Sequence, residues 1–234
     1  MNSHNYSRRK PALSERIAKF SVVTWLIILS VVFSLFTFIL IRISEDYINY
    51  LALKPENIMQ GKYLWTILSH MFAHGSPAHL LINMFVLFSL GGLCEKIIGR
   101  KRFVWFYLSA GLFAGLISVL LSYYFGSSEL GSRIFGAPDV FMVGASGAIF
   151  AIAGLYVTLL PKIKFMILFL PFFSLPAYIM VPLVMITMWI LSIVFNWPIG
   201  NVAHFGGFLV GFLYGLYLKI KYRKKVARLQ KFFR

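Results

Sequence analysis

Acidic residues are scarce in this chain of 234 residues, which contains 7 Asp and Glu against 23 Lys and Arg. Charged residues of both signs make up only 13% of the sequence, whereas hydrophobic residues make up 59%. Soluble domains carry about 25% charged residues, so this composition excludes an ordinary soluble enzyme and a disordered protein. The chain has one cysteine, Cys94, which excludes a scaffold held by intrachain disulfides.

Long apolar segments make up most of the sequence. A helix needs about 20 apolar residues to cross the hydrocarbon core of a bilayer. Such segments predict six membrane-spanning helices, at residues 20–42, 79–95, 103–125, 143–160, 177–195 and 202–220. A further apolar stretch, 163–175, is short and bounded by prolines, so we expect an interfacial or loop segment there rather than a seventh span. The predicted fold class is an all-α polytopic membrane protein.

The basic residues fall mostly on one side of these spans. If six helices alternate in direction, 19 of the 23 Lys and Arg lie on the side that holds both termini. Positive charge marks the cytoplasmic side, so both termini are predicted to be cytoplasmic, in a multi-pass protein of a bacterial plasma membrane. We divide the chain into a basic N-terminal segment 1–19, a membrane domain 20–220 and a basic tail 221–234. The excess charge then attracts anionic membrane lipids, and we expect no nucleic-acid partner.

Few polar residues lie within the predicted spans, and those few are grouped. His79 and Asn83 open the second span, Ser146 opens the fourth, and His204 opens the sixth. These three spans all begin on the side opposite the termini, so the four side chains are expected to converge in the outer half of the bilayer. Polar groups inside a membrane are costly and mark a function by default. The sequence therefore predicts a site at this depth.

The serine is expected to lie below the outer membrane surface. A helix from Ser146 to Leu160 rises about 22 Å, which is less than the ~30 Å thickness of the hydrocarbon core. The preceding stretch is rich in glycine (Gly126, Gly131 and Gly136), and we expect it to be non-helical. Non-helical backbone at this depth must be buried in protein or line a water-filled cavity. A recessed aqueous pocket is the predicted consequence.

Small residues in the fourth and sixth spans favour close packing of these two helices. Gly147 is followed four residues later by an alanine, and Gly207 and Gly211 have the same spacing. Such packing would bring the Ser146 hydroxyl within hydrogen-bond reach of His204. An adjacent imidazole is what a serine needs to become a nucleophile.

The remaining polar residues have complementary roles in this hypothesis. His79 and Asn83 lie one helical turn apart, on one face, and their side chains could donate hydrogen bonds to a developing oxyanion. Phe150 lies one turn after the serine, where its ring could support the imidazole.

In order and spacing, these residues resemble the rhomboid family of intramembrane serine proteases. The resemblance covers residues 20–220 and rests on three motifs: His79-x-x-x-Asn83, Gly144-x-Ser146-Gly147 and Ala203-His204-x-x-Gly207-x-x-x-Gly211. It implies a substrate that is itself a transmembrane protein, with Ser146 as nucleophile and His204 as general base. It also implies an oxyanion hole of His79, Asn83 and the serine N–H, and active-site support from Gly144, Gly147, Phe150, Gly207 and Gly211.

Two positions depart from the pattern of many family members. Trp65 is followed by Thr66 rather than by arginine, which removes any role for an arginine in this loop. Phe150 occupies a position that is often tyrosine, so that the ring is kept and the hydroxyl is lost.

The positions of the histidines and the acidic residues test whether the chain could be a metalloprotein or an aspartyl protease. His70, His74 and His79 could bind zinc, but no carboxylate or thiol lies near them, and we expect no metal and no cofactor. The seven acidic residues are all expected outside the spans, which excludes an aspartyl protease and favours a Ser–His dyad over a triad.

The main alternative function is a non-catalytic rhomboid-like protein that binds membrane clients. A transporter or channel is less favoured, since no repeat and no mid-span charge is apparent.

Overall fold

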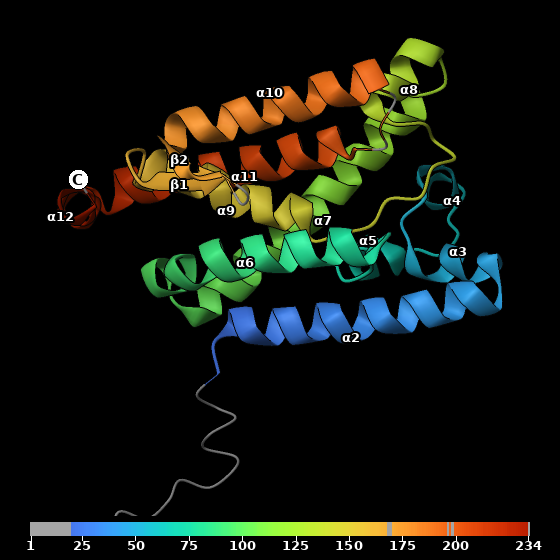
Figure 1. Ribbon diagram of the computed structural model, residues 1–234, viewed down its shortest axis with the longest axis horizontal. Helices are drawn as coiled ribbons and strands as arrows, with labels where there is room; N and C mark the ends of the chain where they lie inside the picture. The colour runs from blue at the N-terminus through green and yellow to red at the C-terminus, as the bar shows by residue number, and fades with distance from the viewer. Residues whose placement is uncertain (1–19, 168–169, 196, 198, 234) are drawn as a thin grey trace, which may run out of the picture.

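The computed structural model describes residues 20–167, 170–195, 197 and 199–233, and this part of the chain is mostly helical (Figure 1). The predicted N-terminal segment, 1–19, lies outside the described residues. The longer helices are α2 (Val22–Ile43), α6 (Pro77–Ile98), α7 (Arg100–Phe125), α9 (Ser146–Leu159), α10 (Ala177–Phe195) and α11 (Asn201–Lys221). The shorter elements are η1 (Glu45–Tyr47), α3 (Ile48–Leu51), α4 (Pro55–Met59), α5 (Thr66–Ser69), α8 (Glu129–Phe135), β1 (Lys164–Ile167), β2 (Leu170–Pro176) and α12 (Arg223–Phe232).

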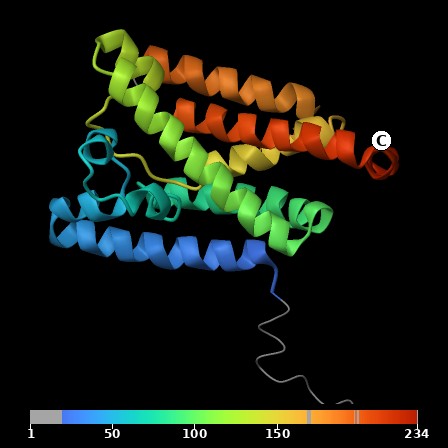
Figure 2. The same ribbon diagram turned by 180° about the vertical axis from the view of Figure 1, so that it is seen from behind.

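The longer helices alternate in direction across one bundle. Within the described residues, five of them (α2, α6, α7, α10 and α11) are long and apolar enough to cross a membrane, and α9 is shorter, with 14 residues. In Figure 1, α2, α7 and α10 run one way and α6, α9 and α11 run back, so that the last three begin at the same end. The start of α2 and α12 lie at the opposite end. Seen from behind, α7 crosses the bundle diagonally (Figure 2).

Two segments contain more secondary structure than the sequence predicts. The described residues of 163–175 do not form a helix, as expected, but most of them belong to β1 and β2, which pair antiparallel, with Lys164 opposite Pro176. Proline disfavours a helix in this segment, so its backbone N–H and C=O groups need other partners, and the pairing of the two strands supplies them. The glycine-rich stretch before Ser146 was predicted to be non-helical throughout, which is wrong for α8. The Ser128 hydroxyl caps α8 by accepting a hydrogen bond from the Gly131 N–H.

One acidic residue, Glu95, lies inside a candidate membrane span, contrary to the prediction. α6 continues past residue 95, and the Glu95 side chain within it is buried. Its carboxylate accepts hydrogen bonds from the backbone N–H groups of Val22 and Val23, at 3.0 and 3.1 Å. These N–H groups belong to the first turn of α2, where they have no partner within the helix and where negative charge is favourable. Glu95 therefore caps α2 together with the Ser21 hydroxyl. The start of α2 lies at the end of the bundle opposite to the start of α11, which holds His204.

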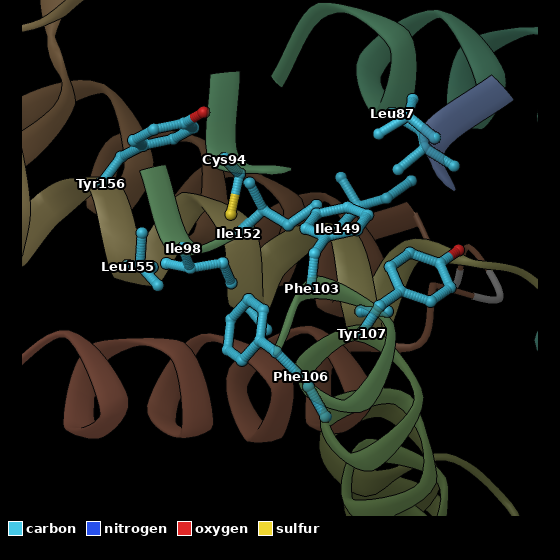
Figure 3. Packing of buried hydrophobic residues seen from close by; sticks show 14 of the residues in the cluster. Leu87, Cys94, Ile98, Phe103, Phe106, Tyr107, Ile149, Ile152, Leu155 and Tyr156 are labelled. Atoms are coloured by element: carbon cyan, nitrogen blue, oxygen red, sulfur yellow. The ribbon is translucent and has the colours of Figure 1, made fainter. Parts of the chain in front are cut away.

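Large apolar side chains fill the space between α6, α7 and α9. Ile152 and Leu155 of α9 lie in one cluster with Cys94 and Ile98 of α6 and with Phe103 of α7 (Figure 3). All five are nearly inaccessible to solvent. This core fixes the position of α9 along nearly its whole length.

Close contact between α9 and α11 depends on glycine. A Cβ atom added at Gly207 would collide with the carbonyl oxygen of Gly147, and one added at Gly211 would collide with the carbonyl oxygen of Ala151. The backbones of the two helices therefore touch, as the spacing of small residues predicts. The first turns of α9 and α11 are held side by side as a result.

Candidate active site

Ser146 and His204 are in direct contact. The serine Oγ lies 2.8 Å from Nε2 of the histidine, so the hydroxyl can donate a hydrogen bond to that nitrogen. Ser146 is the first residue of α9, and His204 lies in the first turn of α11. The glycine contacts between these helices bring the two side chains together. His204 is buried, whereas Ser146 is partly accessible.

Aromatic stacking orients the His204 ring. The ring of Phe150 stacks on it, with centroids 4.5 Å apart and planes inclined by 26°. The other ring nitrogen, Nδ1, is buried, and no described residue gives it a hydrogen bond. The imidazole is therefore held by packing and by the serine, and within the described part of the chain no carboxylate supports it.

His79 and Asn83 face the turn that precedes Ser146. A Cβ atom added at Gly144 would lie 2.9 Å from Cε1 and 3.0 Å from Nε2 of His79, and 3.7 Å from Nδ2 of Asn83. The φ angle of Gly144 is +120°, a conformation that favours glycine, so no side chain fills this space. Asn83 Nδ2 donates to the His79 carbonyl oxygen at 3.0 Å, which orients the amide and leaves its second N–H for another acceptor.

The start of α9 adds backbone donors to these side chains. The first N–H groups of a helix have no partner within it, and no side chain caps the start of α9. The helix dipole also favours negative charge at this position. The backbone N–H groups at the start of α9 therefore follow directly after the Gly144 turn that His79 and Asn83 face, an arrangement that suits a developing oxyanion.

Backbone contacts with the loop between α2 and α6 hold the approach to the serine. The Gly144 N–H donates to the His70 carbonyl oxygen at 2.9 Å. Leu53 and Met142 exchange two backbone hydrogen bonds, at 3.0 and 2.7 Å. These contacts could not be predicted from the sequence, because backbone pairing between distant segments leaves no pattern in side-chain identity.

Two further histidines anchor the same loop. Nδ1 of His70 bonds to the Thr66 carbonyl oxygen at 3.0 Å, and Nδ1 of His74 bonds to the Ser34 hydroxyl at 2.9 Å. Burial lowers the pKa of His70 to about 4. Burial, with a smaller contribution from nearby His79, lowers the pKa of His74 to about 4. Among the described residues, no three His, Cys, Asp or Glu side chains are placed to hold a metal ion.

Trp65 and Thr66 each form a hydrogen bond to a backbone carbonyl oxygen within this loop. Thr66 is buried and its hydroxyl donates to the Tyr63 carbonyl oxygen at 2.7 Å. Trp65 is exposed, and its Nε1 donates to the Tyr50 carbonyl oxygen at 2.9 Å. Threonine at position 66 therefore closes a turn of this loop through its hydroxyl.

Comparison with known proteins identifies the family. The model of the rhomboid domain matches residues 61–221. This chain belongs to the rhomboid family. Rhomboid protease GlpG of Haemophilus influenzae is 29% identical over 180 residues, which cover 77% of this chain and 82% of that protein. The predicted family and the helical membrane fold are thus confirmed, and the chain is a multi-pass membrane protein.

Two eukaryotic rhomboid relatives share a smaller part of their length. RHOMBOID-like protein 5 of Arabidopsis thaliana is 31% identical over 170 residues, which cover 73% of this chain and 48% of that protein. The human presenilin-associated rhomboid-like protein, mitochondrial, is 32% identical over 147 residues, which cover 62% of this chain and 36% of that protein. This chain therefore spans less than half of either relative.

Proposed function

We propose that this rhomboid chain is an intramembrane serine endopeptidase that uses Ser146 and His204 as a catalytic dyad. The observation that carries the proposal is the 2.8 Å contact between Oγ and Nε2, with the imidazole stacked on Phe150. A hydroxyl hydrogen-bonded to an oriented imidazole is the arrangement required for nucleophilic catalysis. The name of the Haemophilus relative, a rhomboid protease, supports the same activity.

The reaction follows from the positions of these atoms. Ser146 Oγ attacks the carbonyl carbon of the scissile peptide bond while Nε2 of His204 accepts the hydroxyl proton. The same nitrogen then gives the proton to the leaving amine, and an acyl-enzyme ester remains on Ser146. Water activated by the imidazole hydrolyses the ester and restores the hydroxyl.

Charge that develops on the carbonyl oxygen has nearby donors. The Ser146 N–H, the His79 ring and the Asn83 amide lie around the turn at Gly144. Donors that are already aimed at the developing charge stabilise the tetrahedral intermediate more than they stabilise the substrate. This difference lowers the barrier to attack.

The substrate in this proposal is another membrane protein, cleaved in or next to its transmembrane segment. The carbonyl groups of a transmembrane helix are occupied by hydrogen bonds, so the segment must unwind before attack. Segments that contain glycine or proline beside small residues are therefore preferred. The predicted location is the plasma membrane of a bacterium, with the site facing outward.

A fluorophosphonate probe tests the proposal directly, because it labels only an activated serine. The purified wild-type protein should be labelled, and Ser146→Ala and His204→Ala should not. Ser89→Ala is a matched control, since Ser89 is an exposed serine of α6 whose hydroxyl donates to the Phe85 carbonyl oxygen of its own helix. Absence of labelling in the wild type, with retained binding of a transmembrane client, would favour the non-catalytic alternative.

A further inference from the structure

A cavity of about 500 Å³ lies at the end of the bundle away from Ser146. It forms where α12 crosses the ends of α6, α7, α9 and α11, at the end that holds the start of α2 (Figure 1). Its volume is in the range of small-molecule sites, about 300–1,000 Å³. The proposed protease activity makes no use of this cavity.

The walls of the cavity are apolar. They come from separate elements, with Leu93 and Ile97 on α6, Leu159 on α9 and Leu218 on α11. Leu229 of α12 closes the remaining side. A space of this kind favours a hydrocarbon group over a polar solute.

Basic side chains line the same cavity. Lys96, Arg102 and Lys225 come from α6, α7 and α12, and all three are exposed. None of them forms an ion pair with a carboxylate in the described part of the chain, and no acidic residue there lines the cavity. Three cations from separate helices therefore meet beside an apolar space without a carboxylate partner among the described residues, and the Lys225 ammonium lies 5.8 Å from the centre of the Tyr222 ring.

Specific contacts hold α12 over the cavity. Its Val226 is buried against the bundle, and its Gln230 Nε2 donates to the Leu159 carbonyl oxygen at 3.1 Å, at the end of α9. The outward face of α12 carries further exposed basic residues, which do not line the cavity: Arg223, Lys224, Arg228 and Lys231. The cavity is thus a defined space between packed helices rather than a gap beside a loose tail.

We propose that this cavity binds one phospholipid of net negative charge from the surrounding bilayer. The phosphate group lies among Lys96, Arg102 and Lys225, and the part of one acyl chain next to the headgroup lies against the apolar walls. Basic pockets between membrane helices favour anionic headgroups in this way. A zwitterionic lipid brings a positive group to the same three cations and binds more weakly.

Native mass spectrometry of the full chain in detergent tests this inference. Dioleoyl phosphatidylglycerol should be retained as one bound copy, and dioleoyl phosphatidylcholine should be retained at least about 10-fold less. The combined variant Lys96→Gln, Arg102→Gln and Lys225→Gln should retain phosphatidylglycerol about 100-fold less, since each cation near an anionic headgroup contributes about fivefold. The matched control, Lys224→Gln, Arg228→Gln and Lys231→Gln, loses the same charge and should bind as the wild type does.

Two further experiments distinguish a lipid seated in the cavity from an anion held by charge alone. Leu229→Trp fills the apolar part and leaves every charge in place, so it should also lose the bound lipid. Soluble glycerol phosphate, which has the headgroup charge without the acyl chains, should not displace it. Equal loss in the matched control, equal retention of phosphatidylcholine, displacement by glycerol phosphate or normal binding in Leu229→Trp would each overturn the proposal.

Discussion

Among single residues, Ser146 and His204 have roles in the proposed mechanism that no neighbour can replace. Ser146→Ala removes the nucleophile and His204→Ala removes the base, so cleavage of a reconstituted transmembrane substrate should become undetectable. Asn83→Ala removes one of several oxyanion donors, which is worth about 10²–10³ in kcat, and should leave weak activity. Thermal unfolding checks that each variant is folded. Full cleavage by a well-folded Ser146→Ala protein would reject the protease assignment.

His70 and His74 make stability depend on pH. Both have a pKa of about 4 in the folded protein, below the usual value of 6.5, so they stay neutral while unfolded chains take up protons. Stability is therefore full above pH 6.5 and falls as the pH drops toward 4, by up to about 1.4 kcal/mol per pH unit for each histidine.

Thermal unfolding in detergent between pH 7.5 and pH 4.5 measures this loss. His70→Asn keeps a side-chain donor for the Thr66 carbonyl oxygen and does not titrate. The variant should show a smaller decrease in unfolding temperature than the wild type. An unfolding temperature that rises as the pH falls would contradict the burial of neutral histidines.

At the scale of elements, the α9–α11 contact should tolerate no added atom. Gly207→Ala places a methyl group against the Gly147 carbonyl oxygen and must push the helices apart, at a cost of about 1–3 kcal/mol. Gly92→Ala in α6 is the matched control, since a Cβ there has nothing within 4 Å. We expect a lower unfolding temperature and lower activity for Gly207→Ala only. Equal behaviour of the two variants would show that this contact is not tight.

α10 contains a proline within the helix, Pro182, and we expect this helix to move when a substrate enters from the lipid. Polar contacts fasten its last turns. Trp189 Nε1 donates to the Ile134 carbonyl oxygen at 3.2 Å, and Asn201 Nδ2 donates to the Ser192 hydroxyl at 2.6 Å. The Ser192 hydroxyl also lies 3.3 Å from the Arg133 carbonyl oxygen, which it can reach as a donor. These bonds tie the last turns of α10 to α8 and to the start of α11.

Weakening these contacts should ease the movement of α10. Trp189→Phe removes one hydrogen bond, worth about 1 kcal/mol, and should raise the open population about fivefold. If opening limits turnover, kcat for a transmembrane substrate rises by a similar factor, whereas labelling by a small fluorophosphonate stays the same. Slower cleavage by a well-folded variant would indicate that α10 must remain closed for catalysis.

For the whole molecule, the orientation in the membrane is the main prediction. Reporter fusions after Arg234 and within 96–102 should be cytoplasmic, and fusions within 126–139 should be external, because the basic residues gather on the first side. The structure puts the start of α2 and α12 at one end of the bundle, as this requires. An external C-terminus would overturn the six-span topology.

Much of the site could be predicted because its chemistry needs particular residue types. Ser146, His204 and the glycines at 207 and 211 are recognisable from residue type and spacing alone, and the structure brings the first two within 2.8 Å. The cap that Glu95 provides for α2 could not be predicted, because it depends on where two helices end. The hairpin and α8 were missed for a similar reason, since an apolar or glycine-rich composition does not specify backbone pairing.

The burial of α9 has a consequence for the order in which the chain is assembled during synthesis. α9 is buried on nearly every side, and its closest neighbour, α11, is made after it. Until residues 201–221 leave the ribosome, the face of α9 that contacts the α11 glycines has no partner. We therefore expect the final packing of α9 to wait for the last span. A chain truncated before residue 201 should be degraded faster than the full chain, although it contains five of the six predicted spans.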